Sequence, residues 1–295
     1  MTVKPAKTCL AIALVALLGI AAPPLARASD HQSSEQTPPA QVPPSAAPET
    51  DDDTTINPAE PDFTIISLPT SLRLPEFKSA FRVTHRFARP LNGDVGGLAA
   101  DLFGLDSGAQ IGLEYRFGIV RNGEIGIHRT SDRTIEFFSQ YGILRQRPNR
   151  PVDVTVLASI DGTNNFRDQY TQAFGAIVSR RFGERAALYV EPTWVHDANV
   201  QPSSAAEARD TFMVGLGGRF LVRPTVSVAA EFSPRASGYR PGVNHGSVAI
   251  EKRAGGHVFQ LNFSDSFATT MGQIARGGPA SKDWFLGFNI SRKFY

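Results

Sequence analysis

The chain has 295 residues, of which 41% are hydrophobic, and its 30 Lys and Arg against 28 Asp and Glu give a net charge of +2. This balance, with no clustered basic surface, excludes a nucleic-acid-binding protein. The single cysteine, Cys9, lies in the N-terminal leader, so disulfides and thiol chemistry are excluded from the mature protein.

The first 28 residues have the features of a secretory signal peptide. Lys4 and Lys7 precede an apolar run at residues 9–22, and Ala26-Arg27-Ala28 forms an A-x-A cleavage site. We predict cleavage after Ala28. No later stretch approaches 18 consecutive apolar residues, so a helical membrane protein is excluded and a periplasmic, secreted or outer-membrane barrel protein is expected.

Residues 29–62 are predicted to be a disordered linker. Pro, Ser, Ala, Thr, Gln and acidic residues dominate this segment, which has no Lys or Arg and contains Asp51-Asp52-Asp53. Such a composition buries too little apolar surface to offset the loss of chain entropy. Residues 63–295 then form one folded domain, with 27 Lys and Arg against 20 Asp and Glu. Its first part, residues 63–75, is expected to pack under the fold or form a short extra strand.

Two-sided strands follow one another through this domain. Residues 109–117 alternate most cleanly, with apolar side chains at every second position and polar side chains or glycine between them. Alternation of this kind predicts about twelve strands, at residues 77–87, 109–117, 124–130, 134–144, 152–161, 170–181, 187–196, 211–222, 226–233, 247–252, 257–264 and 283–295. Short links alternate with long ones, with the short link at residues 131–133 as the exception, as periplasmic turns alternate with extracellular loops in outer-membrane barrels.

The last strand, residues 283–295, is about one membrane thick and ends on an aromatic residue. Trp284, Leu286, Phe288, Ile290 and Phe294 fall on one face at period two. The strand resembles the closing strand of Gram-negative outer-membrane barrels, which the outer-membrane assembly machinery recognises. The apolar face includes residue 294 and not residue 295, so the resemblance is one residue out of the usual register.

Together these patterns predict an all-β fold: an up-and-down antiparallel transmembrane β-barrel of about 12 strands, preceded by a signal peptide and a disordered linker. Its expected location is the Gram-negative outer membrane, in contact with lipid and with both termini periplasmic. A soluble lipocalin-like barrel is the alternative, because apolar-in and apolar-out strands look alike in sequence. Soluble up-and-down barrels of that kind have about eight strands, so twelve favour the membrane.

Seven short runs in this domain also resemble a known family: Thr84-His85-Arg86-Phe87, Phe103-Gly104-Leu105-Asp106-Ser107-Gly108-Ala109, His128-Arg129-Thr130-Ser131, Leu144-Arg145-Gln146, Ser179-Arg180-Arg181-Phe182, Gly255-Gly256-His257-Val258-Phe259-Gln260-Leu261 and Gly287-Phe288-Asn289-Ile290-Ser291-Arg292. They are similar to an uncharacterised bacterial family described as a membrane-bound β-barrel domain. The resemblance covers residues 65–295. It implies the fold and the location and carries no known chemistry.

The predicted functional site is the polar face of the strands, which would line the lumen. Nine charged or ionisable residues on this face are candidates for lining the lumen and binding a solute: Arg82, Arg86, Glu114, Arg116, His128, Glu136, Glu191, Arg219 and Glu231. Such interior charges in a membrane protein indicate function. We therefore expect a narrow channel or binding pore for small solutes, with arginines favouring anions. A non-conducting barrel, serving as a membrane anchor or partner platform, is the alternative.

Other candidate sites are weaker. Residues 97–103 are expected to form a short helix that plugs or gates the mouth. His245, Ser247 and Asn262 resemble the His/Ser/Asn set of outer-membrane phospholipases, a third hypothesis set against the expectation that the protein is no enzyme. Only His128 among the strand histidines has lumen parity, so neither a metal site nor a cofactor is expected. The glycines in Gly215-Leu216-Gly217-Gly218 are expected to relieve crowding or kink a strand.

Overall fold

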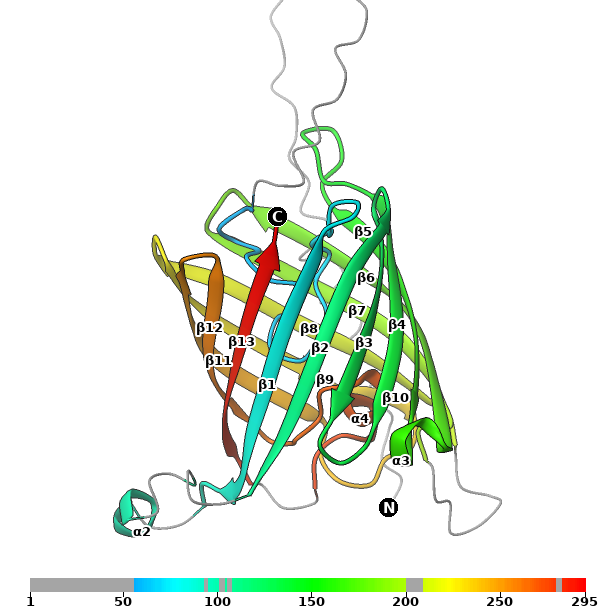
Figure 1. The fold of residues 1–295 in the computed structure, drawn as a ribbon, viewed down its shortest axis with the longest axis vertical. Helices are drawn as coiled ribbons and strands as arrows, with labels where there is room; N and C mark the ends of the chain where they lie inside the picture. The colour runs from blue at the N-terminus through cyan, green and yellow to red at the C-terminus, as the bar shows by residue number, and fades with distance from the viewer. Residues whose placement is uncertain (1–55, 93–94, 101–103, 105–107, 200–208, 280–282) are drawn as a thin grey trace, which may run out of the picture.

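The computed structural model describes residues 56–92, 95–100, 104, 108–199, 209–279 and 283–295, which form a tilted barrel (Figure 1). The predicted signal peptide and the predicted linker up to residue 55 lie outside the described residues. Within the described part of the chain, no helix is long and apolar enough to cross a membrane.

Twelve antiparallel strands close the barrel, as the sequence predicts. They are β1 (Ser79–Pro90), β2 (Ala109–Val120), β3 (Gly123–Thr130), β4 (Ile135–Leu144), β5 (Asp153–Gly162), β6 (Asp168–Phe182), β7 (Ala186–His196), β8 (Thr211–Arg223), β9 (Val226–Ser233), β11 (His245–Ala254), β12 (His257–Ser264) and β13 (Phe285–Phe294). β1 pairs with β13, placing Ser79 opposite Phe294 and Arg86 opposite Gly287. The predicted all-β, up-and-down architecture is confirmed.

One strand was not predicted. β10 (Arg235–Gly238) pairs with the beginning of β8, at Thr211 to Met213, while β9 pairs with β8 from Leu216 onward. β10 therefore extends the sheet outside the closed ring. Four residues are too few to display a period of two, which is why alternation could not reveal it.

Links of two kinds lie at opposite ends of the barrel. The tight links at residues 121–122, 183–185, 224–225 and 255–256 lie at the end that carries the C-terminus. The long links and the helices α2 (Val95–Ala100), α3 (Thr163–Phe166) and α4 (Met271–Arg276) lie at the opposite end (Figure 1). We call these the tight-link end and the long-loop end.

Apolar side chains cover the outside of the barrel and polar side chains fill its inside. On β2, Leu113 is 48% exposed, whereas Glu114 and Arg116 are 5% and 4% exposed. On β11, Ile250 is 56% exposed and Glu251 1%. A soluble barrel would bury the apolar set, so the lipocalin-like alternative is wrong, and the apolar exterior matches a lipid environment.

Residues 56–76 form a segment that we call the hairpin; it enters the interior of the barrel, and only its last residue, Glu76, is exposed. It starts at the tight-link end, where the Asn57 side chain donates to the Gly183 carbonyl over 3.4 Å. It turns back between Ile65 and Leu68, whose backbone N and O are 2.7 Å apart, and Thr64 and Pro69 form an antiparallel bridge.

The hairpin corrects two expectations. Residues 63–75 pack within the barrel, neither under it nor as a strand of its sheet, and Ile65 and Leu68 are fully buried there. The ordered chain also begins before residue 63, since Ala59 and Glu60, in the predicted linker, are 0% and 2% exposed. The composition of residues 56–62 predicts disorder because the segment cannot bury itself. The barrel interior supplies the apolar contacts and hydrogen-bond partners that it lacks.

Candidate functional site

The nine residues predicted to line the lumen all point inward, and none is more than 5% exposed. Four of them bind the hairpin directly: Arg82, Arg86, Arg219 and Glu231. Glu114 and Arg116 form a network beside it, and His128 lies 3.9 Å from Glu136. The remaining one, Glu191, has no hydrogen-bond partner for its carboxylate among the described residues.

Glu231 on β9 holds the tip of the hairpin. Its carboxylate accepts the backbone N–H groups of Ile66, Ser67 and Leu68 over 2.9 to 3.0 Å. His245 of β11 lies on the other side, with its Nε2 3.0 Å from Glu231 Oε1. Hydrogen bonds to a charged group are each worth about 1.5–3 kcal/mol, so this cluster is a strong anchor for a turn that carries no charge of its own.

Wall residues from several other strands bind the carbonyl oxygens of the same turn. Arg219 of β8 donates to the carbonyls of Thr64 and Ile65 over 2.9 and 3.2 Å. The Ile65 carbonyl also accepts from Gln260 of β12 over 2.7 Å, and the Ile66 carbonyl from Asn289 of β13 over 3.0 Å and from Arg82 of β1. The polar wall thus replaces water for a buried turn.

Glycines on β8 give the hairpin the space that it fills. A Cβ at Gly217 would lie 2.2 Å from Ile65 Cδ1, and one at Gly215 would lie 3.0 Å from Leu68 Cδ1. The inward alanines of the neighbouring strands belong to the same apolar cluster as Ile65 and Leu68: Ala173, Ala187, Ala229 and Ala249. The glycines on β8 were predicted to relieve crowding, and the side chains for which they leave room are those of the hairpin.

An ion-pair network supports the hairpin on the opposite wall. Arg116 contacts Glu114 over 2.5 Å and Glu124 over 2.6 Å, and Glu124 also accepts the backbone N–H of Leu74 over 3.2 Å. The Arg116 guanidinium carbon lies 5.5 Å from the centre of the Phe63 ring. Arg82 of β1 also contacts Glu114, over 3.4 Å, so the network ties β1, β2 and β3 to the base of the hairpin.

Hydroxyl groups fix the base of the hairpin near the tight-link end. Ser71 and Ser179 of β6 have hydroxyl oxygens 2.5 Å apart, and Ser71 and Tyr189 both donate to Glu60 over 3.1 and 3.0 Å. Burial raises the pKa of the Glu60 carboxyl, while the Arg181 guanidinium opposes this effect. The base is therefore held by neutral donors around one acidic group.

A second closure lies at the long-loop end, where α4 folds inward. Thr270 caps the helix in a reciprocal pair with Gln273, and the Met271 backbone N–H donates to Glu136 of β4 over 3.0 Å. The Thr270 hydroxyl donates to Asp161 of β5 over 2.8 Å. A cavity of about 30 Å³, room for about one water, touches both closures, at Ser67 and Met271.

The gate predicted at residues 97–103 is wrong in position for its described part. Residues 97–100 belong to α2, which lies beside the long-loop end and away from the barrel mouth (Figure 1), and residues 101–103 lie outside the described residues. Ala99 and Ala100 are exposed, so these small side chains bury no surface that would hold α2 over the opening.

The His/Ser/Asn hypothesis finds its residues inside the barrel. His245, Ser247 and Asn262 are at most 2% exposed, and His245 Nε2 is 3.4 Å from Ser247 Oγ. The same nitrogen is closer to Glu231, and neither polar side-chain atom of Asn262 has a hydrogen-bond partner. Lipid on the outside of the barrel cannot reach this serine, so the arrangement does not support a lipid hydrolase.

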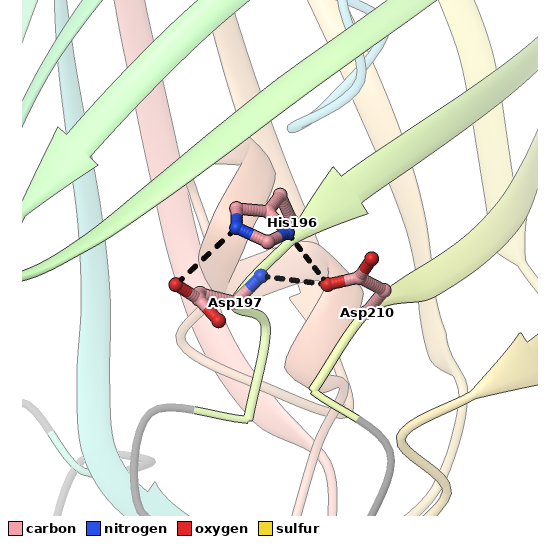
Figure 2. Close-up of side chains that lie close together, drawn as sticks. All are labelled: His196, Asp197 and Asp210. Carbon is pink, nitrogen blue, oxygen red and sulfur yellow. Dashed lines mark hydrogen bonds and ion pairs between the residues drawn. The ribbon is translucent and has the colours of Figure 1, made fainter.

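His196, Asp197 and Asp210 come together where β7 ends and β8 begins, a cluster that alternation missed because residue 196 has apolar parity (Figure 2). His196 Nδ1 is 2.7 Å from Asp210, and Nε2 is 3.5 Å from Asp197. Arg209 contacts Asp197 over 2.6 Å. Each ring nitrogen faces a different carboxylate, so the three side chains link the end of β7 to the start of β8.

Comparison with known proteins identifies a family. The family model described as "Membrane bound beta barrel domain (DUF5777)" matches residues 62–294. No curated protein sequence matches the chain.

Three solved structures are similar at low identity. An outer-membrane channel from Pseudomonas putida F1 is 13% identical, with 75% of this chain and 97% of that chain covered and a TM-score of 0.47. The outer-membrane protein Omp33 of Acinetobacter baumannii is 10% identical, with 74% and 99% covered and a TM-score of 0.41. The NanC porin is 7% identical, with 74% and 99% covered and a TM-score of 0.45.

Proposed function

The chain belongs to the membrane-bound β-barrel family, and from this premise we propose that it is an outer-membrane channel for small solutes, kept plugged by its own residues 56–76. The observation that carries the proposal is the contact between the predicted solute-binding residues and the hairpin. Arg82, Arg219 and Glu231 bind backbone groups of the hairpin tip, which occupies the place a solute would take.

The way in which the hairpin is held supports a removable plug. Its tip is attached by hydrogen bonds and apolar contacts, without a covalent link to the wall, and its donors and acceptors can exchange with water. Gly215 and Gly217 keep the space for it on one wall. When the hairpin leaves, charged side chains of the opposite wall line a water-filled path, as in known selective pores.

The orientation belongs to the same proposal. Tight links face the periplasm in outer-membrane barrels, so the hairpin and the C-terminus would lie on the periplasmic side. A periplasmic partner or a solute gradient would then act on the segment that precedes residue 56. In this proposal the protein conducts solutes and catalyses no reaction.

Single-channel recording in planar bilayers tests the proposal. The mature chain is expected to stay closed for most of the time, whereas a variant lacking residues 56–74 should give discrete openings. A variant lacking residues 95–100 is the matched control, because α2 lies beside the barrel, and it should behave as the mature chain does. A folded hairpin-deletion barrel that stays silent would contradict the channel and favour the non-conducting membrane anchor or partner platform.

A further inference from the structure

We propose that the opened barrel prefers cations, with the luminal carboxylates Glu191, Glu231, Glu136 and Asp161 as its cation-binding groups. The inference rests on the proposed channel function and names the class of solute. It also reverses the anion preference expected from the luminal arginines alone, because the carboxylates inside outnumber them.

Buried charges on the barrel wall are mostly acidic. Among the described strand residues, four buried arginines point inward: Arg82, Arg86, Arg116 and Arg219. Eight buried acidic residues do so: Glu114, Glu124, Glu136, Asp153, Asp161, Glu191, Glu231 and Glu251. Arg181, which is less buried, and Lys293, whose side chain is 5% exposed, lie near the tight-link end and reduce this excess without removing it.

Three of the four arginines are neutralised within the wall itself. Arg82 and Arg116 share Glu114, and Arg116 also binds Glu124. Arg219 makes two contacts with Glu251, of 2.5 and 2.8 Å. None of these ion pairs involves the hairpin or α4, so they persist when the closures leave and hold those arginines against the wall.

Three of the remaining carboxylates are hydrogen-bonded to the closures. Glu231 accepts three backbone N–H groups of the hairpin, Glu136 accepts the Met271 N–H of α4, and Asp161 accepts the Thr270 hydroxyl. Removing the hairpin takes away the donors to Glu231, and displacing α4 takes away those to Glu136 and Asp161. The exposed carboxylates then face the path, where a hydrated cation can replace the lost donors.

Glu191 gives an independent indication of the same chemistry. It is 0% exposed on β7, points into the lumen, and neither of its oxygens has a hydrogen-bond partner among the described residues. Its Cβ lies next to Gly215 of β8, and Gly217 on the same strand pairs with Glu231 of β9. A buried carboxylate without donors requires a cation or a proton. A cation that enters the opened lumen can therefore bind between Glu191 and Glu231.

The test measures ion selectivity of the barrel lacking residues 56–74, from its reversal potential in a KCl gradient. We expect K⁺ to permeate several-fold better than Cl⁻. Glu191→Gln and Glu231→Gln should each lower this ratio, and together they should bring it close to one. Glu76→Gln, an exposed position next to β1, is the control with the same change of charge and should leave the ratio unchanged.

The possible results separate the two proposals. Chloride preference, or a ratio that Glu191→Gln and Glu231→Gln do not change, overturns the cation inference and leaves the plugged channel standing. A folded barrel without conductance overturns the channel and the cation inference together. Recording Glu191→Gln alone guards against variants that fail to fold, since removing one unpaired buried charge should not destabilise the barrel.

Discussion

The hairpin and α4 close the barrel from opposite ends, and they do so by different means. The hairpin reaches across the lumen: its tip contacts β1, β8, β9, β12 and β13 on one side, and its base contacts β3, β6 and β7 on the other. The short helix packs on one side, against β5 to β8, and adds a hydrogen bond to Glu136 on β4. Only the hairpin is therefore placed to block the whole cross-section.

The two closures also differ in where their stability comes from. The hairpin depends on partners far away in sequence, such as Glu231, which lies 165 residues from Ile66. α4 is organised largely by its own capping box between Thr270 and Gln273. Substitutions in the barrel wall should therefore release the hairpin. Substitutions in the capping box should loosen α4 without affecting the hairpin. Four predictions test this contrast, from the largest expected effect to the smallest.

Glu231→Ala should release the hairpin tip. The substitution leaves three backbone N–H groups without an acceptor, a loss of about 3–5 kcal/mol of docking free energy. Ser67→Cys, buried in the docked state, should then react much faster with a membrane-impermeant maleimide than it does in the parent barrel. Glu231→Gln keeps an acceptor oxygen and should have a smaller effect. Equal labelling rates in all three proteins would show that Glu231 does not hold the tip.

Gly217→Val should push the hairpin off its seat on β8. The added side chain would overlap Ile65, whose Cδ1 lies 2.2 Å from an ideal Cβ, and overpacking of this kind costs about 1–3 kcal/mol. Ile65→Ala should restore docking in the double variant, as followed by the same maleimide labelling at Ser67→Cys. Gly255→Val, in a tight link with open space around it, is unsuitable as a control because its φ is +56°.

A better control for that experiment is Gly108→Val, because an added Cβ there meets nothing within 4 Å and its φ is not positive. This variant should label at the parent rate. Faster labelling in Gly108→Val than in Gly217→Val would mean that the hairpin responds to general destabilisation and not to its seat.

Thr270→Ala should loosen α4 and leave the hairpin docked. Loss of an N-cap side chain costs about 1 kcal/mol, and the Asp161 carboxylate loses one donor. Labelling of Ala275→Cys, fully buried in the closed barrel, should accelerate, while labelling of Ser67→Cys should not. Acceleration at both positions would show that the two closures open as one unit.

The smallest effect concerns pH. Burial raises the pKa of Glu60 above its ordinary value of 4.5, so the docked hairpin binds this proton more tightly than the undocked one. Docking is then strongest at pH values below 4.5 and weakens as pH rises through the raised pKa. Labelling of Ser71→Cys should increase over that range, and Glu60→Gln should abolish the dependence. An increase toward acid pH would contradict the assignment.

The barrel could be predicted from the sequence because the pattern that identifies each strand lies within that strand. Alternation at period two located twelve strands and the inward side of Arg82, Glu114 and Glu231, since each strand displays both faces within a few residues. The tip of the hairpin carries no such pattern. Ile65 and Ile66 lie in a short segment with prolines, and only the assembled wall explains why they are buried.

The sequence contains some information about the position of the second closure. α2 and α4 are equally short, and apolar content alone favoured the loop that contains α2. Thr270 and Gln273, however, have the spacing of a capping box, which marks a helix N-terminus in the link between β12 and β13. The cluster at His196 was missed because residue 196 has apolar parity and because its two carboxylates come from positions just outside the strands, where alternation gives no information.

The central claim, that the hairpin itself closes the pore, is tested most directly by tethering it. Ser71 and Ser179 have hydroxyl oxygens 2.5 Å apart, close to the S–S length of about 2.0 Å, and Cys9 is the only native cysteine. We would record single-channel currents of Ser71→Cys/Ser179→Cys with Glu231→Ala, before and after adding a reductant to the same bilayer. Silence when oxidised and openings once reduced are the predicted result; currents that reduction does not change would contradict it.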